Sequence, residues 1–372
     1  MKIGITCYPS FGGSGILASA LGEELARLGH EIHFISYERP VRVPFAADRI
    51  FFHPVTINDY GLFKYPDYTL PLSVKMAEVT RDFGLDVLHV HYAVPHATAA
   101  LLARSMLENT ATRAPKIVTT LHGTDTTLLG RDPGYGPAIR HALVHSDSVT
   151  TVSSFLKGET QRLLQLDRPI EVIPNFFAPK PPRRSREAVR RELGVAPDEC
   201  LLLHSSNLRQ LKRIDLLLAA VARLEEHSPC KFLILAGASF EPFRAEVARL
   251  GLTDRVIVRE RVSEIEEYMQ AADLGLYSSE VESFCLSILE GMFFGCPSVA
   301  FAVGGIPEVV ENGVSGALVP WEDGAEGLAQ AALALMKDDA RRRAMGSAAA
   351  ERARRLFSAE AVVPQYERVY NA

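Results

Sequence analysis

Short runs of β-branched and other apolar residues alternate with longer helical patterns along the whole chain, and this alternation restricts the fold more than any other feature. Parallel strands must be joined by long crossover connections, usually helices. The repeated alternation therefore predicts an α/β fold with parallel sheets that helices cover on both faces. In the first half the expected strands are residues 2–7, 31–36, 50–55, 86–91, 116–121, 148–152 and 171–173, with expected helices such as 15–28 and 70–83.

A proline-rich segment interrupts the alternation near the middle of the chain. The four prolines from Pro174 to Pro182 exclude a helix and predict a linker. The alternation then resumes, with expected strands at residues 200–205, 231–236, 255–258, 273–278, 297–301 and 316–319. Because 372 residues suffice for two domains of ordinary size, we expect two Rossmann-like domains, residues 1–176 and 177–356, that face each other across a cleft.

The composition restricts the partners and the compartment of the protein. The formal net charge is −5, whereas a chain that binds nucleic acid usually carries a basic balance or stripe. No apolar run approaches the length that spans a bilayer, and the amino terminus lacks the pattern of a signal peptide. The five cysteines show no CxxC pair and no spacing typical of metal ligands. We therefore expect a soluble cytoplasmic protein that binds neither nucleic acid nor membrane.

A glycine-rich loop follows the first expected strand and opens the first helix. Gly12, Gly13 and Gly15 would let backbone amides approach a ligand closely, and a helix N-terminus favours negative charge. Two other interpretations stay open: the glycines can simply form a turn, or the G-x-G-x-x-A pattern from Gly13, with Glu38 downstream, can be the fingerprint of an NAD-dependent oxidoreductase. Against the fingerprint, Pro9 and its neighbours separate the glycines from the strand, where a fingerprint needs an immediate tight turn.

Two cations follow the first expected strand of the second half. Arg209 and Lys212 lie three residues apart at the start of a helix, so we expect them to converge on one anion. A guanidinium can bind two phosphate oxygens, and an ammonium supplies a point charge. Further along, Glu282 and Glu290 flank a largely apolar segment. A carboxylate as deep as Glu290 needs donors such as ribose hydroxyls, although a plain charged helix also fits this spacing.

Loops at two other strand ends carry further candidates. His122 lies in a glycine loop after strand 116–121, and a second glycine loop, residues 303–308, follows strand 297–301. His122 is the better functional candidate because His89 and His91 fall inside an expected strand, where a histidine is usually a satisfied core residue. The sequence has no DxD motif and no spacing typical of metal ligands. We therefore expect Arg, Lys and helix N-termini to neutralise phosphate charge without a metal ion or another cofactor.

Several segments resemble those of a known enzyme family. Residues 282–290 resemble the E-x7-E motif of retaining GT-B glycosyltransferases of family four, and residues 303–308 (VGGIPE) resemble their glycine loop. The segments CYPSFGGSG, LFKYPDYTLPLSVKMAEV, LHVHYAVPHA, TTLHGTD and NLRQLKR resemble the family members that transfer N-acetylglucosamine from UDP-N-acetylglucosamine to L-malate in bacillithiol biosynthesis. The resemblance covers almost the whole chain. It implies a GT-B fold, retention of anomeric configuration, no metal ion, and a carboxy-terminal segment, residues 357–372, that packs back on the first domain.

The resemblance also implies a role for each matching residue. The implied catalytic residues, on the diphosphate or the transferred sugar, are Arg209, Lys212, Glu282 and His122. The implied donor-binding residues are Gly12, Gly13, Gly15, Arg209, Lys212, Glu282, Ser283, Phe284 and Glu290, with Glu290 on the ribose. The implied acceptor-binding residues, around L-malate, are Ser14, Tyr92, Thr120 and Arg209.

Three positions differ from the family pattern. Cys285 replaces a usual glycine beside the sugar, Ser154 replaces a usual asparagine, and residues 236–239 (AGAS) replace a GDGP turn. Two alternatives therefore stay beside the main hypothesis: a related transferase that uses another sugar or a lipid as acceptor, and an NAD-dependent oxidoreductase. The sequence does not determine whether copies of the chain form a homo-oligomer.

Overall fold

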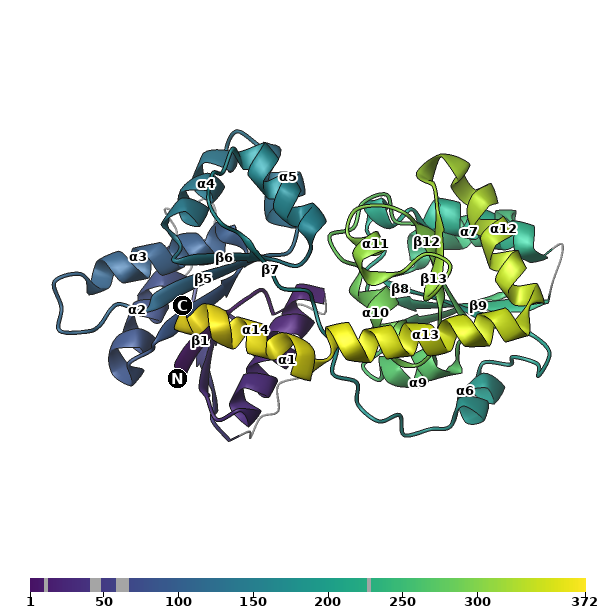
Figure 1. The fold of residues 1–372 in the computed structure, drawn as a ribbon, viewed down its shortest axis with the longest axis horizontal. Helices are drawn as coiled ribbons and strands as arrows, with labels where there is room; N and C mark the ends of the chain where they lie inside the picture. Colours follow the sequence, from purple (N-terminus) through teal and green to yellow (C-terminus); the bar gives the residue numbers. More distant parts are fainter. Residues whose placement is uncertain (10–12, 41–47, 58–66, 226–228) are drawn as a thin grey trace. The chain divides into compact units, whose positions relative to one another are not determined.

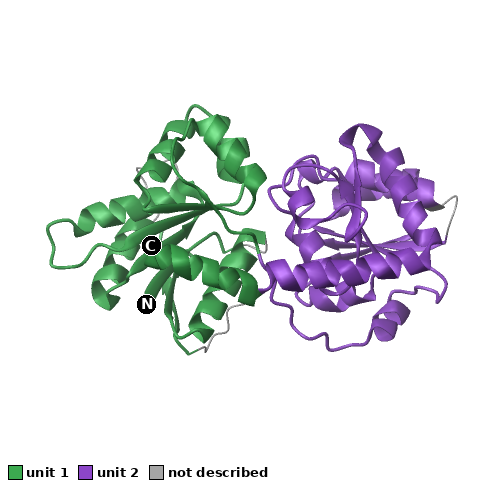
Figure 2. Cartoon of the chain, viewed as in Figure 1, with its two compact units in different colours: residues 1–175, 359–372 green, residues 176–358 purple. Residues whose placement is uncertain are grey.

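The computed structural model describes residues 1–9, 13–40, 48–57, 67–225 and 229–372, and these form two compact units (Figure 2). Unit 1 comprises Met1–Asn175 and Ala359–Ala372, and unit 2 comprises Phe176–Ser358. The chain passes from unit 1 to unit 2 within the proline-rich segment, where prolines prevent a helix from forming.

Unit 1 is built on a seven-stranded parallel sheet with the strand order β3-β2-β1-β4-β5-β6-β7. Its strands are β1 (Lys2–Thr6), β2 (Glu31–Ser36), β3 (Ile50–Pro54), β4 (Val87–His91), β5 (Lys116–Leu121), β6 (Ser148–Thr151) and β7 (Glu171–Val172). Its helices are α1 (Gly13–Arg27), α2 (Thr69–Phe83), α3 (Thr98–Leu107), α4 (Gly136–His145), α5 (Ser154–Leu164) and α14 (Ala359–Asn371), with short helical turns η1 (Ala93–Ala97), η2 (Thr124–Leu128) and η3 (Leu129–Arg131).

The central strands of this sheet are buried because helices cover both of its faces. Every residue of β4 is buried, and so is every residue of β5 after Lys116. Parallel strands in this position are near-continuous apolar runs, since neither face meets water. The buried polar side chains of β4 and β5 therefore need hydrogen-bond partners inside the unit.

The carboxy-terminal helix α14 packs against α1 and β5 of unit 1 (Figure 1). Three polar contacts fix it there: the Tyr370 hydroxyl lies 2.8 Å from His89 Nδ1, Lys116 Nζ donates to the Val369 carbonyl at 2.6 Å, and His30 Nε2 lies 2.9 Å from Glu367 Oε1. The last residues of the chain are thus part of the core that supports the central strands.

Unit 2 repeats this architecture with a six-stranded parallel sheet in the order β10-β9-β8-β11-β12-β13. Its strands are β8 (Cys200–Ser206), β9 (Cys230–Ala236), β10 (Val256–Glu260), β11 (Leu274–Tyr277), β12 (Ser298–Phe301) and β13 (Gly316–Val319). Its helices are α6 (Arg186–Glu192), α7 (Ile214–Glu225), α8 (Arg244–Arg249), α9 (Ile265–Ala271), α10 (Leu286–Phe293), α11 (Ile306–Val309), α12 (Gly324–Lys337) and α13 (Asp339–Phe357), with turns η4 (Gln210–Lys212), η5 (Glu241–Phe243) and η6 (Trp321–Asp323). The two parallel sheets confirm the fold class that the strand–helix alternation predicts.

Two further sequence expectations concern the cysteines and the membrane. All five cysteines are free and buried, as small core residues are. Within the part of the chain that the structure describes, no helix combines the length and the apolar character that crossing a bilayer requires.

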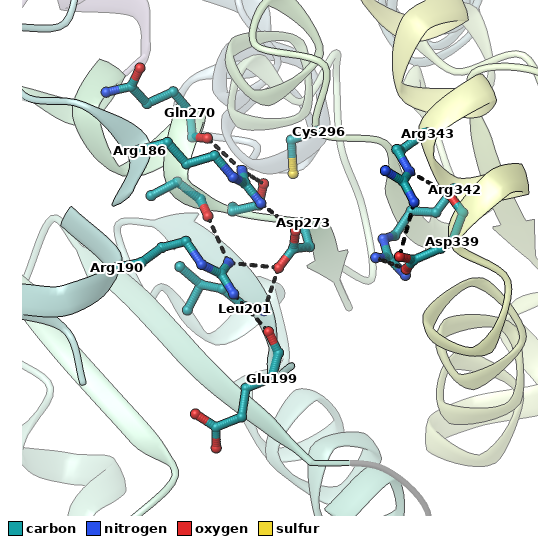
Figure 3. Close-up of polar contacts among 12 residues, drawn as sticks. Arg186, Arg190, Glu199, Leu201, Gln270, Asp273, Cys296, Asp339, Arg342 and Arg343 are labelled. Carbon is teal, nitrogen blue, oxygen red and sulfur yellow. Dashed lines mark hydrogen bonds and ion pairs between the residues drawn. The ribbon is translucent and has the colours of Figure 1, made fainter. Parts of the chain in front are cut away.

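Arginines of α6 anchor this helix to a largely buried carboxylate at the start of β11 (Figure 3). Asp273 Oδ2 accepts hydrogen bonds of 2.8 Å from Arg190 Nη1 and from the Leu201 main-chain amide, while Oδ1 pairs with Arg186. An adjacent cavity of about 500 Å³ is lined by four arginines and five carboxylates, so its charged groups balance and do not favour an anion. The network instead ties the first helix after the linker to strands β8 and β11.

We expect Asp273→Ala to lower the free energy of unfolding of unit 2 by about 2–4 kcal/mol, because it leaves two arginines without their carboxylate in a site that is mostly closed to water. The only tryptophan, Trp321, lies in unit 2, so its fluorescence during urea unfolding reports on this unit. Glu241→Ala is the matched control: its ion pair with Arg244 is 76% and 60% exposed, and we expect a change of at most about 0.5 kcal/mol. Equal effects of the two substitutions would contradict the anchoring role of Asp273.

Candidate active site

The winding of each sheet reverses at one point. Unit 1 adds β2 and β3 on one side of β1 and then β4 on the other, and unit 2 does the same around β8, with β11 on the far side. In open parallel sheets such a reversal leaves a crevice at the carboxyl ends of the two strands, where ligands bind. The predicted site residues follow these strands: Ser14 and Tyr92 come after β1 and β4, and Arg209, Lys212 and Glu282 come after β8 and β11.

Two of the predicted acceptor residues meet at the reversal in unit 1. Ser14 lies in the first turn of α1, and its Oγ is 2.6 Å from the hydroxyl of Tyr92. Tyr92 directly follows β4, adopts a left-handed backbone with φ 83°, and donates its main-chain amide to the Thr120 carbonyl at 2.9 Å. A residue of this size rarely adopts a positive φ, so the turn that aims Tyr92 is a constrained one.

The glycines predicted to bind the donor lie at the start of α1. The helix begins at Gly13, which is exposed, and Gly15 is buried in its first turn. Gly12 lies outside the described residues. The glycine loop therefore does open a helix, as the sequence predicts, and the donor-binding role of the loop stays a prediction.

The Thr120 hydroxyl is hydrogen-bonded to side chains of the neighbouring strands. Its Oγ1 lies 2.7 Å from both His89 Nε2 and Thr150 Oγ1, and the residue is fully buried. The polar chain continues from His89 to the hydroxyl of Tyr370 on α14. The Thr120 hydroxyl is thus hydrogen-bonded within the sheet and its carbonyl holds Tyr92, and the acceptor-binding role of Thr120 stays a prediction.

His122 lies among buried histidines that the sequence analysis assigned to the core. Its Nε2 is 2.8 Å from Nδ1 of His91, and the two rings stack with centroids 5.1 Å apart. Burial lowers the pKa of His122 to about 3 and holds that of His91 well below its ordinary value, so both imidazoles are neutral at neutral pH. Although His89 and His96 lie nearby, no three His, Cys, Asp or Glu side chains among the described residues could hold a metal ion.

Asp125, three residues after His122, is a further buried group that the sequence analysis did not select. Its Oδ1 accepts the Ala93 amide at 3.0 Å, and it thereby links the loops after β4 and β5. Burial raises the pKa of its carboxyl to about 7, because a charged carboxylate is poorly solvated there. The TTLHGTD segment contains this residue, but its partner Ala93 is 32 positions away, so no local signal in the sequence identifies the contact.

An ion pair occupies the reversal in unit 2. Lys212 Nζ pairs with Glu282 Oε1, which also accepts a hydrogen bond of 2.8 Å from Ser279 Oγ. Burial opposes the charge of Lys212, but the charge and hydrogen bond of Glu282 outweigh it and raise the pKa of the ammonium above its ordinary value. The Ser278 hydroxyl donates to the Lys212 carbonyl at 2.8 Å and fixes the backbone beneath the pair.

Arg209 and Lys212, which the sequence predicts to converge on one anion, have different surroundings in this structure. Arg209 directly precedes the turn η4 and is exposed, whereas the Lys212 side chain is 17% exposed and pairs with Glu282. One cation is thus accessible and the other is held by a carboxylate. Their proposed action on a diphosphate stays a prediction.

The second glycine loop contacts the Glu282 main chain. The amide of Gly305 donates to the Glu282 carbonyl at 2.9 Å, and a Cβ built on Gly304, whose φ is +57°, would lie 1.9 Å from the same oxygen. No side chain could be accommodated there. The VGGIPE loop therefore holds the Glu282 backbone in place, and the Gly305 amide is already used in this contact.

Helix α10 carries the remaining predicted donor residues. Glu290 is 5% exposed within it, and Ser283 is partly exposed just before it. The Phe284 side chain packs edge-to-face on Phe357 and is buried, so its ring belongs to the core, and the predicted donor contact of this residue stays a prediction. Cys285 adopts φ 71°, a left-handed conformation that explains why a glycine suits this position.

We expect Lys212→Met to lower the free energy of unfolding of unit 2 by about 3 kcal/mol, because it leaves the Glu282 carboxylate buried without its cation. The double variant Lys212→Met/Glu282→Gln removes both charges and should recover most of that loss. Arg249→Met is the control, since the side chains of its ion pair with Glu246 are 67% and 34% exposed. Urea unfolding followed by Trp321 fluorescence measures all three, and a double variant no more stable than Lys212→Met would contradict the buried-charge explanation.

Comparisons with known proteins identify the family. Residues 11–181 match the model described as Glycosyltransferase Family 4, and residues 185–352 match that of Glycosyl transferases group 1. The chain is 42% identical to N-acetyl-alpha-D-glucosaminyl L-malate synthase of Bacillus anthracis over 372 residues, which are all of this chain and 96% of the relative. It is 29% identical to the D-inositol 3-phosphate glycosyltransferase of Kribbella flavida over 92% of this chain and 86% of the relative.

Solved structures show the same fold at low identity. Sucrose-phosphate synthase from Thermosynechococcus elongatus aligns with a TM-score of 0.81 at 22% identity, over 100% of this chain and 98% of that one. Anabaena Alr3699/HepE, solved in complex with UDP and glucose, aligns with a TM-score of 0.80 at 20% identity, over 100% and 99% of the two chains. The chain therefore belongs to the glycosyltransferases and has the GT-B fold, which excludes the NAD-dependent oxidoreductase that the glycine loop alone left open.

Proposed function

We propose that this glycosyltransferase moves N-acetylglucosamine from UDP-N-acetylglucosamine to the hydroxyl of L-malate, with retention of the anomeric configuration, as the first step of bacillithiol biosynthesis. The observation that carries the proposal is the 42% identity, over the whole chain, to a relative named N-acetyl-alpha-D-glucosaminyl L-malate synthase. The first-half segments that resemble this group include the loops with Ser14, Tyr92 and His122.

In the proposed reaction, the malate hydroxyl oxygen bonds to the anomeric carbon while the bond from this carbon to the diphosphate oxygen breaks. The hydroxyl proton passes to the departing UDP, whose oxygens gain negative charge. Cations that are already in place stabilise such charge without reorganisation. Arg209 would supply an accessible guanidinium and Lys212 an ammonium, which Glu282 keeps protonated. Glu290 would bind the ribose, and Glu282 and His122 the transferred sugar.

The hydroxyl pair in unit 1 supports a compact acid as acceptor. Without ligand, the hydroxyls of Ser14 and Tyr92 lie 2.6 Å apart, and one must donate to the other. A carboxylate only accepts hydrogen bonds, so it could receive one from each hydroxyl in place of this contact. A neutral acceptor could still accept the one hydroxyl hydrogen that the pair does not use, but such a hydrogen bond is weaker than one to a charged carboxylate.

The acceptor assignment predicts a preference that UDP release can measure. With UDP-N-acetylglucosamine as donor, L-malate should be preferred over D-malate, succinate, simple sugars and inositol 3-phosphate, the last being the acceptor in the name of another relative. Tyr92→Phe should raise the KM for L-malate about tenfold, the effect of losing one hydrogen bond to a charged group, with little change in the KM for the donor. Tyr268→Phe, on α9 outside both reversal points, is the control. A faster reaction with a sugar, a lipid or inositol 3-phosphate would overturn the malate assignment and leave the family unchanged.

The proposal also predicts independence of divalent metal ions, because Arg209 and Lys212 are assigned the charge that a metal would otherwise neutralise. Turnover should persist at more than half its rate in excess EDTA. If EDTA abolished turnover and magnesium or manganese restored it, a metal ion and not the two cations would neutralise the phosphate charge. Arg209→Met measured in the same buffers completes the test: its turnover should fall at least a hundredfold, whether or not metal is present.

A further inference from the structure

We propose that His91 is a positioning residue that fixes the tautomer of His122, so that His122 presents its Nδ1–H to the ligand as a hydrogen-bond donor. The catalytic consequence rests on the proposed function, whereas the tautomer itself does not. His91 belongs to β4, and His122 directly follows β5. The parallel register pairs His91 with Thr120, so the two imidazoles come together across neighbouring strand ends.

The contact has only two neutral forms. His91 Nδ1 and His122 Nε2 are 2.8 Å apart, so one nitrogen carries the hydrogen and the other accepts it. In the first form His91 donates from Nδ1 and has no hydrogen on Nε2, which places the hydrogen of His122 on Nδ1. In the second form both hydrogens lie on Nε2, and His122 Nδ1 becomes an acceptor. The unpartnered nitrogen of His91 distinguishes the two forms.

His91 Nε2 is shielded from solvent and has no hydrogen-bond partner among the described residues. The second form would place an N–H there, and an orphaned buried N–H is rarer in proteins than an under-satisfied acceptor. The first form leaves only a lone pair at this position. Burial lowers the pKa of both imidazoles, so a charged form does not replace either of them. The first form is therefore the favoured one.

A neighbouring histidine shows the same pattern independently. His96 Nδ1 lies 2.5 Å from the His91 carbonyl, which can only accept, so His96 must carry its hydrogen on Nδ1. Its Nε2 is also buried without a partner in the described part of the chain, and in a neutral imidazole this nitrogen then has no hydrogen. His96, which contacts the His91 backbone, thus has an Nε2 with no hydrogen and no partner, the same state that is inferred for His91.

The tautomer determines what His122 can do. With its hydrogen on Nδ1 and its Nε2 occupied by His91, the imidazole offers one donor and no free lone pair. It can therefore donate to a sugar hydroxyl or a phosphate oxygen, but it cannot remove a proton from an acceptor. His122 would orient or stabilise the donor substrate, and general-base catalysis by this residue is excluded by the same assignment.

Nitrogen-15 NMR of the histidine-labelled full chain tests the tautomer directly, since protonated and bare imidazole nitrogens have well-separated shifts. The His122 signals are assigned by their loss in His122→Gln. The wild type should show the hydrogen on Nδ1, and His91→Phe, which keeps a ring of similar shape but removes the bond, should shift His122 toward a mixture of tautomers. A wild-type hydrogen on Nε2, or no change in His91→Phe, would overturn the proposal.

The chain offers a matched control in His33, a fully buried strand histidine whose Nδ1 lies 2.9 Å from His53 Nε2 on the neighbouring strand. His33→Phe breaks a comparable contact between two imidazoles away from the β1/β4 reversal, together with the 2.9 Å contact of His33 Nε2 to Glu31, and should leave the His122 signals and turnover unchanged. His91→Asn can place its amide N–H near the position of Nδ1, and in this orientation it should rescue both the Nδ1–H tautomer and the rate. It also serves as the second variant if His91→Phe does not fold.

Steady-state kinetics distinguishes a positioning role of His91 from a nonspecific loss of activity. His91→Phe should lower kcat about tenfold with UDP-N-acetylglucosamine and L-malate. The KM for L-malate should change less than twofold, because the lost hydrogen bond orients His122, which is assigned to the transferred sugar and not to L-malate. Equal kcat losses in His91→Phe and His33→Phe would overturn the positioning role. A wild type that transfers nothing to L-malate would overturn the proposed function instead, and the NMR result would still decide the tautomer.

Discussion

Parallel strand pairing is the constraint on which both units depend. It demands a crossover after every strand, so helices cover both faces of each sheet and the strand interiors are apolar. Side chains that act on a ligand are then restricted to the loops at the carboxyl ends. In both units the winding reverses beside the first strand, and this brings distant residues together: Ser14 and Tyr92 are 78 positions apart, and Lys212 and Glu282 are 70 positions apart. The site is thus a product of topology more than of any local motif.

Buried polar side chains at the two reversal points differ in their charge. In unit 1 no cation faces the histidines at the ends of β4 and β5 in the contacts described, and burial keeps them neutral, with the pKa of both His89 and His122 lowered to about 3. In unit 2 a buried ammonium remains charged because Glu282 accompanies it. A buried charge without a partner would be lost by a change of protonation. One reversal point therefore holds neutral imidazoles, and the other holds a charged ion pair.

The sequence predicts the strands well because parallel strands are short apolar runs between helices, and β2, β5 and β13 have the expected bounds. It also places the candidate residues at strand ends. What it cannot predict is the direction of a side chain near such an end: Thr120 turns into the sheet toward His89, and Phe284 turns into the core. Nor does local spacing reveal partners across the fold. The spacing of Arg209 and Lys212 predicts a shared anion, but Glu282, which is far away in the sequence, competes for the lysine.

A contact between residues far apart in the sequence also explains why the E-x7-E motif and the glycine loop of residues 303–308 occur together. The carbonyl of Glu282 lies where any Cβ on Gly304 would have to be, and it accepts the Gly305 amide, so the start of E-x7-E and the glycine loop form one physical unit. Cys285 follows with φ 71°, a conformation that costs a non-glycine residue about 1–2 kcal/mol. Hydrogen bonds on both sides hold it there, from Gly305 to Glu282 and from the Ile288 amide to the Cys285 carbonyl at 3.2 Å. The departure from glycine is therefore accommodated as local strain, and the backbone that carries Glu282 keeps the conformation that a glycine would allow.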